Sequence, residues 1–385
     1  MPITPVADQA VALRYAPPHG WSAPLPPVDS PGTLVLAFGA PEYIDDPAAL
    51  QELASRYPSS VIIGCSTAGE ILGTEVSDGS LSVGIRQFRH TRLATAFAPV
   101  RGTSDSFHAG QSIATQLDGP GFRAVLVLAD GLQTNGTELI RGLHSLLPEG
   151  VTVTGGLAGD GEHFRRTWVL KHGVPTTNIV VAVGFYGDRI RVAHGCCGGW
   201  DVFGPQRRVT RSRSNVLYEL DGKPALPLYK EYLGELASGL PATALLYPLE
   251  MRPTPTDGEA VVRSVLAVDE AANSLIFGGD IPEGSYVRLM HANFDRLVEA
   301  AGQSASIAAE TAPGDAARLI IAVSCVGRRI ILGERTEEEL EAVAERFAPG
   351  DALLGFYSYG ELSPIASGRC TLHNQTMTIT SIREV

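Results

Sequence analysis

The stretch Val61-Ile-Ile-Gly-Cys-Ser-Thr-Ala-Gly-Glu70 decides the fold, because a buried strand runs straight into a turn with glycines and one carboxylate. Thr33-Leu-Val-Leu-Ala37 upstream is a second apolar strand. Between the two strands lies a helix with an apolar stripe formed by Leu50, Leu53, Ala54 and Tyr57. This strand–helix–strand order is typical of α/β folds with parallel strands.

The same unit occurs twice more. In the second copy, a strand over 124–129 and a helix from about Asn135 lead to the turn Gly155-Gly-Leu-Ala-Gly-Asp160. In the third copy, a strand over 319–323 and a helix with the capping box Thr336-Glu-Glu-Glu339 lead to Gly355-Phe-Tyr-Ser-Tyr-Gly-Glu361. The spacing between helix and turn matches in all three, which predicts an internal duplication.

The segments between the copies are rich in alternating apolar residues and turn residues, at 80–98, 165–197, 207–219 and 259–290. We therefore expect an α/β fold with mixed sheets, built from repeated strand–helix–strand units with inserted β-meanders. Residues 1–30 contain seven prolines and are predicted to be a lead-in segment. The predicted modules are residues 31–225 and 226–385.

Composition narrows the class of protein. Apolar residues make up 44% of the chain, charged residues 19%, and the formal net charge is −12, which is unfavourable for nucleic-acid binding. The longest apolar stretches are far shorter than the roughly 20 residues of a membrane-spanning helix, and no signal peptide is apparent at the N-terminus. Five cysteines without a CxxC motif favour free thiols in a reducing compartment, so we expect a cytoplasmic location without membrane or nucleic-acid partners.

The three turns are the first candidate ligand site. Each provides glycines and one carboxylate after a strand, where ligands of α/β sheets bind, and pseudo-symmetry would let the turns converge. Converging carboxylates suit an amine, a guanidinium or the ammonium group of an amino acid. The competing interpretation is that each carboxylate caps nearby backbone or pairs with an arginine. The predicted ligand-binding residues are Cys65, Ser66, Thr67, Glu70, Gly156, Asp160, Tyr357, Tyr359 and Glu361.

An enzyme remains the alternative to a binding protein. Cys65 and Ser66 follow a strand directly, as a nucleophile would, but the surrounding residues do not form the Gly-x-Ser-x-Gly motif of a nucleophile elbow. No catalytic residue is therefore predicted. A scaffold protein without a pocket is the third class, and it would expose a large apolar patch instead.

A second candidate site lies in Val192-Ala-His-Gly-Cys-Cys-Gly-Gly-Trp-Asp-Val-Phe203. Haem needs an axial ligand within an apolar pocket, and His194 is the candidate metal ligand, with Cys196 or Cys197 as substitutes. The competing interpretation is a buried histidine at a strand end, next to unreactive thiols.

These motifs resemble the FIST family of sensory proteins. Residues 61–70, residues 155–160 and the run from Gly204 to Ala225 are similar to its N-terminal module, and Gly355 to Pro364 is similar to the end of its C-terminal module. The resemblance implies an intracellular sensor of small molecules, with amino acids as proposed ligands. Because no output domain is attached, it also implies signalling to a separate partner such as a histidine kinase. Some stand-alone members of the family bind haem and respond to nitric oxide.

Overall fold

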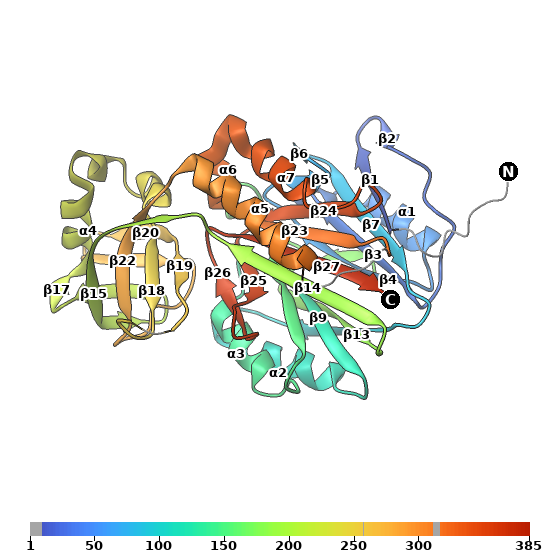
Figure 1. The fold of residues 1–385 in the computed structure, drawn as a ribbon, viewed down its shortest axis with the longest axis horizontal. Coiled ribbons are helices and arrows are strands. Elements are labelled where there is room, and N and C mark those ends of the chain that lie inside the picture. Colours follow the sequence, from blue (N-terminus) through green and yellow to red (C-terminus); the bar gives the residue numbers. More distant parts are fainter. Residues whose placement is uncertain (1–9, 257, 311–315) are drawn as a thin grey trace.

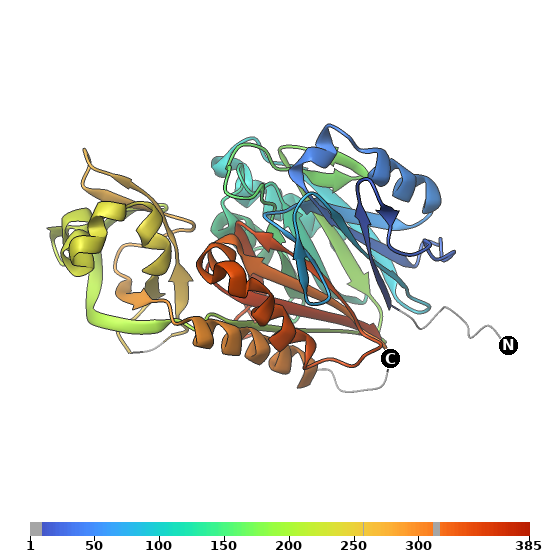
Figure 2. The same ribbon diagram turned by 90° about the horizontal axis from the view of Figure 1, so that it is seen from above.

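The computed structural model describes residues 10–256, 258–310 and 316–385, which form two bodies (Figures 1 and 2). The large body contains both ends of the described chain, and the small body is formed by residues 201–291. The small body has a hydrophobic core of its own, whose members all come from residues 203–289. A separate core marks it as an independent packing unit.

The large body contains three strand–helix–strand units, each with its two strands paired in parallel. The predicted repeat is therefore confirmed, and with it the mixed α/β fold class. The units comprise β3 (Thr33–Gly39), α1 (Ala48–Arg56) and β4 (Val61–Ser66); β9 (Phe122–Ala129), α3 (Gly136–His144) and β10 (Thr152–Leu157); and β23 (Leu319–Cys325), α7 (Thr336–Ala344) and β24 (Ala352–Ser358).

Antiparallel strands extend each unit into a mixed sheet. The first strand of each unit pairs with an antiparallel strand: β3 with β7 (Leu81–Gln87), β9 with β13 (Ile179–Tyr186) and β23 with β27 (Met377–Glu384). The next strand in each sheet is β1 (Ala10–Ala16), β8 (Arg92–Pro99) and β14 (Ile190–Cys197), respectively. The short β2 (Gly20–Trp21) pairs with β1. The predicted lead-in segment thus contains a strand of the first sheet, because β1 pairs along six residues with β7.

A hairpin follows each unit, and it joins the sheet of a different unit. The hairpin of the first unit pairs with β24, that of the second with β4, and that of the third with β10. The exchange is cyclic, so the sheet of each unit is completed by the hairpin of another unit. The hairpins are β5 (Glu70–Leu72) with β6 (Glu75–Ser77), β11 (Val169–Lys171) with β12 (Val174–Thr176), and β25 (Gly360–Pro364) with β26 (Cys370–His373).

One glycine occupies the same position in the second strand of every unit. A Cβ atom added at Gly64, Gly155 or Gly355 would lie 1.8 Å from a carbonyl oxygen of the neighbouring parallel strand. No side-chain rotation can relieve a contact with backbone, so only glycine is compatible with this close approach. The repeated glycine in the sequence thus reflects strand packing.

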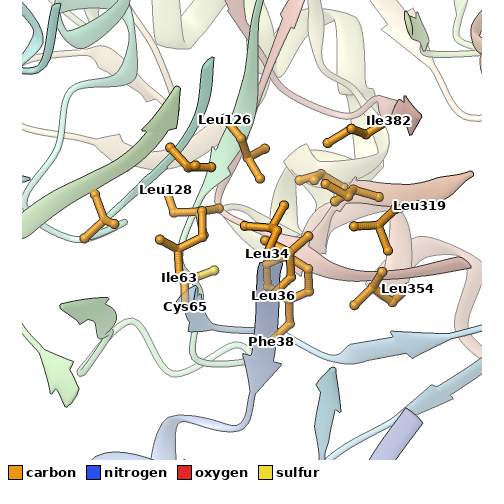
Figure 3. Packing of buried hydrophobic residues seen from close by; sticks show 14 of the residues in the cluster. Leu34, Leu36, Phe38, Ile63, Cys65, Leu126, Leu128, Leu319, Leu354 and Ile382 are labelled. Atoms are coloured by element: carbon orange, nitrogen blue, oxygen red, sulfur yellow. The ribbon is translucent and has the colours of Figure 1, made fainter. Parts of the chain in front are cut away.

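The three sheets face one another across a shared hydrophobic core (Figure 3). Leu36 and Phe38 of β3 meet Leu128 of β9 and Leu354 of β24 there, and all four are fully buried. Burying one such side chain contributes about 1.5–3 kcal/mol. Helices cover the outer faces: α1 packs on the first sheet, α2 (Ser106–Leu117) and α3 on the second, and α5 (Phe294–Glu310) and α7 on the third.

The small body is inserted between β14 and α5 (Figure 1). Its predicted hairpin is present, with Asp269 paired to Ser274. The boundary at 225/226 falls inside this body, after the first residue of α4, so the two predicted modules do not coincide with the two bodies. Its elements are β15 (Asp201–Arg213), β16 (Val216–Leu220), β17 (Lys223–Pro224), α4 (Ala225–Leu233), β18 (Leu249–Arg252), β19 (Val261–Arg263), β20 (Val265–Asp269), β21 (Ser274–Phe277) and β22 (Tyr286–His291).

The short helix α6 (Val326–Leu332) begins directly after β23 and lies where the two bodies meet. Within the described residues, no helix is long and apolar enough to cross a membrane.

Candidate functional site: the cleft between the two bodies

A cleft of about 1200 Å³ lies between the two bodies. The large body lines it with the segment after β9, the end of β10 and the junction of β23 with α6; the small body contributes residues 214–215, 239–242, 264–266 and 277–280. The cleft thus lies outside the carboxyl ends of three strands, which is where α/β sheets bind ligands. Its volume is sufficient for a small organic molecule.

Two buried hydroxyl groups in the wall of the cleft have no hydrogen-bond partner among the described residues. They belong to Thr134 of the large body, 7% exposed, and Ser264 of the small body, 3% exposed. Nearby, Asn374 donates from Nδ2 to the carbonyl of His373 at 3.0 Å and accepts from the Ser264 amide at 3.5 Å. Buried hydroxyls are normally paired, so these two are unsatisfied hydrogen-bonding groups next to the cleft.

Large apolar side chains are exposed at the cleft. Phe164 is 50% exposed, Leu266 46% and Ile330 37%, and each comes from a different part of the fold. The ring of Phe164 stacks on Tyr359 with centroids 4.4 Å apart, although its backbone lies in the left-handed region with φ 51°. Exposed apolar side chains gathered around one concave surface are typical of a binding site.

Asp160 holds the segment that carries Phe164. Its Oδ2 accepts the backbone amides of Arg165 at 2.8 Å and Arg166 at 2.7 Å, and its Oδ1 accepts the hydroxyl of Tyr359. The same hydroxyl accepts the backbone N–H of Phe164 at 3.3 Å. Asp160 therefore positions the stacked aromatic pair at the cleft, although it does not itself line the wall.

The turns of the first and third units are closed instead. Glu70 accepts the hydroxyls of Thr67 and Ser80, and Glu361 accepts those of Ser358 at 2.9 Å and Thr376 at 2.9 Å. The backbone amides of Ser80 and Thr376 donate to the same carboxylates, at 3.0 and 3.2 Å. Burial raises the pKa of Glu70 to about 7 and that of Glu361 to about 8.

The structure brings one of the nine predicted ligand-binding residues, Tyr359, to the wall of the cleft, with Asp160 directly behind it. The others are buried inside the large body because the exchanged hairpins cover the strand ends. For example, Ser66 Oγ accepts the amide of Trp168 just before β11, and the Tyr357 hydroxyl donates to Glu339 at 2.7 Å. The buried set is Cys65, Ser66, Thr67, Glu70, Gly156, Tyr357 and Glu361.

The residues that the small body brings to the cleft were not predicted from the sequence. Phe277-Gly-Gly-Asp280 begins at the last residue of β21 and has the same combination of strand, glycines and acid as the three turns. This signal was present in the sequence. The pairing of the segment with Asn135, whose Nδ2 donates to Asp280 Oδ1 at 2.9 Å, had no local signal because 145 residues separate the two.

Cys65 and Ser66 lie in the interior, away from the cleft. Both are fully buried, and burial raises the pKa of the Cys65 thiol. A nucleophile needs a lowered pKa and access for its substrate. Neither side chain has these properties in this conformation.

The predicted haem ligands also lie apart from the cleft. His194 and Cys196 are on β14, which pairs along its whole length with β27. Helix α5 packs closely on one face of β14, so that a Cβ added at Gly195 would lie 2.0 Å from the Ser304 carbonyl oxygen. Burial lowers the pKa of His194 and raises that of Cys196. Among the described residues, none of His194, Cys196 and Cys197 lines the cleft, and no cluster of three metal-ligating side chains occurs. These residues do not fit an axial ligand to a haem in the cleft.

An uncharacterized protein of Methanocaldococcus jannaschii is 26% identical over 254 residues, which are 58% of this chain and 47% of the archaeal protein. The chain thus spans about half the length of that relative. A cyanuric acid hydrolase of A. caulinodans aligns with 57% of this chain and 84% of its own at 11% identity, with a TM-score of 0.23. A score this low supports neither a shared fold nor a shared activity.

Two family models cover most of the chain. The FIST N domain matches residues 33–223, and the FIST C domain matches residues 225–364. The chain therefore belongs to the FIST family of sensory, ligand-binding proteins.

Proposed function

We propose that this protein is a non-catalytic sensor of the cytoplasm, which binds a small molecule in the cleft between its two bodies and signals to a separate protein. The observation that carries the proposal is the wall of the cleft. It combines two unpaired buried hydroxyls, one from each body, with exposed apolar side chains from both. A ligand that pairs with both hydroxyls would contact both bodies at once.

Contact with both bodies gives the ligand a means of changing their arrangement. The chain crosses between the bodies only at residues 200–201 and 291–293 within the described residues, and Asp201 ties the crossings together by accepting from Arg296 and Asn293. A ligand that prefers one relative position of the bodies shifts the population toward it. Two short crossings are suited to a hinge.

Helix α6 connects the cleft to the outer helices of the third sheet. Ile330 lines the cleft, while Arg328 on the same helix pairs with Glu339 of α7 at 2.8 Å and donates to the Leu297 carbonyl of α5 at 2.7 Å. Both charged side chains are fully buried. A displacement of α6 would therefore move α5 and α7, whose outer surface we propose as the contact for a partner such as a histidine kinase.

The test is a thermal-shift screen of metabolites, including amino acids, with two tryptophan variants. Ala242→Trp fills the cleft from the small body, and Ala271→Trp places the same side chain in the exposed β20–β21 turn outside it. We expect a ligand at 100 times its Kd to stabilise the parent and Ala271→Trp by about 2.7 kcal/mol, but not Ala242→Trp. Hydrogen exchange of α5 and α7 should change with the ligand. A screen without any stabilising compound contradicts the proposal, as does full binding by Ala242→Trp.

The haem hypothesis has its own spectroscopic test. A Soret band in protein purified from iron-supplied cells, shifted by nitric oxide and lost in His194→Ala, would assign the ligand to β14 and remove the cleft from the proposal. We expect no such band, because His194 does not line the cleft.

A further inference from the structure

We infer that the ligand of the cleft is a small organic cation, an amine carried by an apolar or aromatic group, and not an anion or a zwitterion. The inference rests on the proposed function, because it specifies the chemistry of the same site.

The charged residues in the wall of the cleft are all acidic. Glu138 and Glu162 come from the large body and Asp280 from the small body, and the described lining contains no lysine, arginine or histidine. A ligand carboxylate or phosphate entering this wall would meet like charge without a compensating cation. A protonated amine would meet opposite charge from both bodies.

Two arginines close to the wall are already occupied. Arg141 pairs with Glu138 from the outside and is 61% exposed, so it offsets that carboxylate. Arg263 lies behind the wall, where its Nε donates to the Asp280 carbonyl at 3.1 Å and its Nη1 to the Leu372 carbonyl at 3.0 Å. These bonds hold the guanidinium on backbone oxygens, and its buried positive charge also interacts with Asp280. Glu162 makes no ion pair among the described residues.

One of the two carboxylate oxygens of Asp280 can accept a hydrogen bond from a ligand. Its Oδ1 accepts from Asn135 across the cleft at 2.9 Å, and its Oδ2 has no hydrogen-bond partner among the described residues. A carboxylate held in place by one hydrogen bond and open on its other oxygen is a suitable acceptor for an ammonium group. The bond to Asn135 also fixes its position between the two bodies.

The amino end of α3 also reaches the cleft and would by itself favour an anion. Its positive dipole end is already matched, because Glu138 lies in the first turn and Asn135 Oδ1 accepts the Glu138 amide at 3.2 Å. The helix end therefore does not reverse the negative character of the wall.

Two further features are compatible with a ligand of this kind. The unpaired hydroxyls of Thr134 and Ser264 can accept N–H donors from a ligand, although a hydroxyl can also donate. The stacked rings of Phe164 and Tyr359 provide a flat apolar surface, and aromatic faces attract cations. Acids, acceptors and aromatic rings on one wall together match an amine with an apolar body.

The experiment compares four probes that share a phenyl ring and a short chain but differ in charge: phenethylamine, 2-phenylethanol, phenylalanine and 3-phenylpropionate. Binding to the full chain is measured by isothermal titration. We expect phenethylamine to bind tightest and 3-phenylpropionate not at all. Asp280→Asn and Glu162→Gln should each weaken phenethylamine about fivefold and leave 2-phenylethanol unchanged. Glu149→Gln removes an exposed carboxylate outside the cleft and should change neither probe.

Other outcomes overturn the inference in distinguishable ways. If 3-phenylpropionate or phenylalanine binds as tightly as phenethylamine, and Ala242→Trp abolishes that binding, the cleft remains the site and the preference for cations is wrong. If no probe binds at about 10 mM, the inference falls, and the metabolite screen decides whether the proposed function falls with it.

Discussion

The turns of the first and third units resemble each other more than either resembles the turn of the second unit. Glu70 and Glu361 each lie six residues after the packed glycine and accept the hydroxyl three residues before them. Each then accepts the amide and hydroxyl of the residue that precedes the antiparallel strand, Ser80 or Thr376. In the second unit, Asp160 instead accepts two amides of the following loop and the Tyr359 hydroxyl.

This difference separates the part of the duplication that builds the fold from the part that builds the site. The buried glutamates close two turns and extend the core. The second turn lacks such a glutamate, and its acid supports an aromatic pair at the edge of the cleft. The candidate site therefore lies where the pseudo-symmetry is broken.

The largest loss of stability is expected at the glycine that occupies the same position in all three units. Alanine at Gly64, Gly155 or Gly355 would place Cβ 1.8 Å from a backbone oxygen, so each variant should lose more than about 3 kcal/mol of unfolding free energy, or fail to fold. Urea unfolding or the yield of folded protein measures this loss. Gly350→Ala, with no atom within 4 Å of the added Cβ, is the control. Tolerance at any one of the three positions would contradict their structural equivalence.

The buried glutamates of the two closed turns should make the stability of the protein depend on pH. Burial raises the pKa of Glu361 to about 8, so the folded protein holds a proton that the unfolded chain releases above about pH 4.3. The stability of the parent should therefore fall as pH rises from about 4.3 to about 8. Glu361→Gln lacks this dependence and should match the parent near pH 4, but exceed it at pH 9 by at most about 5 kcal/mol, since one pKa unit corresponds to about 1.4 kcal/mol.

The matched variant Glu70→Gln should also be more stable than the parent at pH 9, but by a smaller free energy of unfolding, because the pKa of Glu70 rises only to about 7. Urea unfolding across the pH range measures both. A parent whose stability increased between pH 5 and pH 8 relative to the two variants would refute buried, protonated glutamates in these turns.

The smallest change in stability is expected at the second turn, where ligand binding should respond instead. Asp160→Ala releases the backbone amides of Arg165 and Arg166 and should cost about 1–2 kcal/mol. Because Phe164 then loses its position, affinity for a ligand from the screen should fall about tenfold, or about 1.4 kcal/mol. Tyr359→Phe keeps the ring and should lose less. Unchanged affinity in Asp160→Ala would show that the loop carrying Phe164 does not contribute to ligand binding.

The sequence was informative wherever structure depends on neighbours along the chain. The three units, their turns and the hairpin near Asp269 follow from periodicity and turn residues, and all are present. The exchange of hairpins could not be predicted, because the pairing of Ile71 with Gly355 joins opposite ends of the chain without a local pattern. For the same reason, the sequence did not indicate which residues form the small body.

Glu339 illustrates how burial overrides a local motif. The sequence Thr336-Glu-Glu-Glu339 predicts a capping box, but the helix is preceded by Arg335, and Thr336 donates its hydroxyl to the Gly333 carbonyl. Glu339 is fully buried and pairs with Arg328 while accepting from Ser324 and Tyr357. Only the packing of α6 against α7 supplies that partner. The candidate site had the same limitation, since half of its wall comes from the small body.

The cyclic exchange of hairpins also constrains how the protein is made. During synthesis the first unit emerges before the strand that completes its sheet, and the edge of β24 is finished by residues translated long before it. Until the last hairpin docks on β10, open sheet edges could pair with other chains. Such long-range closure slows folding. The three sheets of the large body should therefore be complete only after β25 and β26 have emerged from the ribosome.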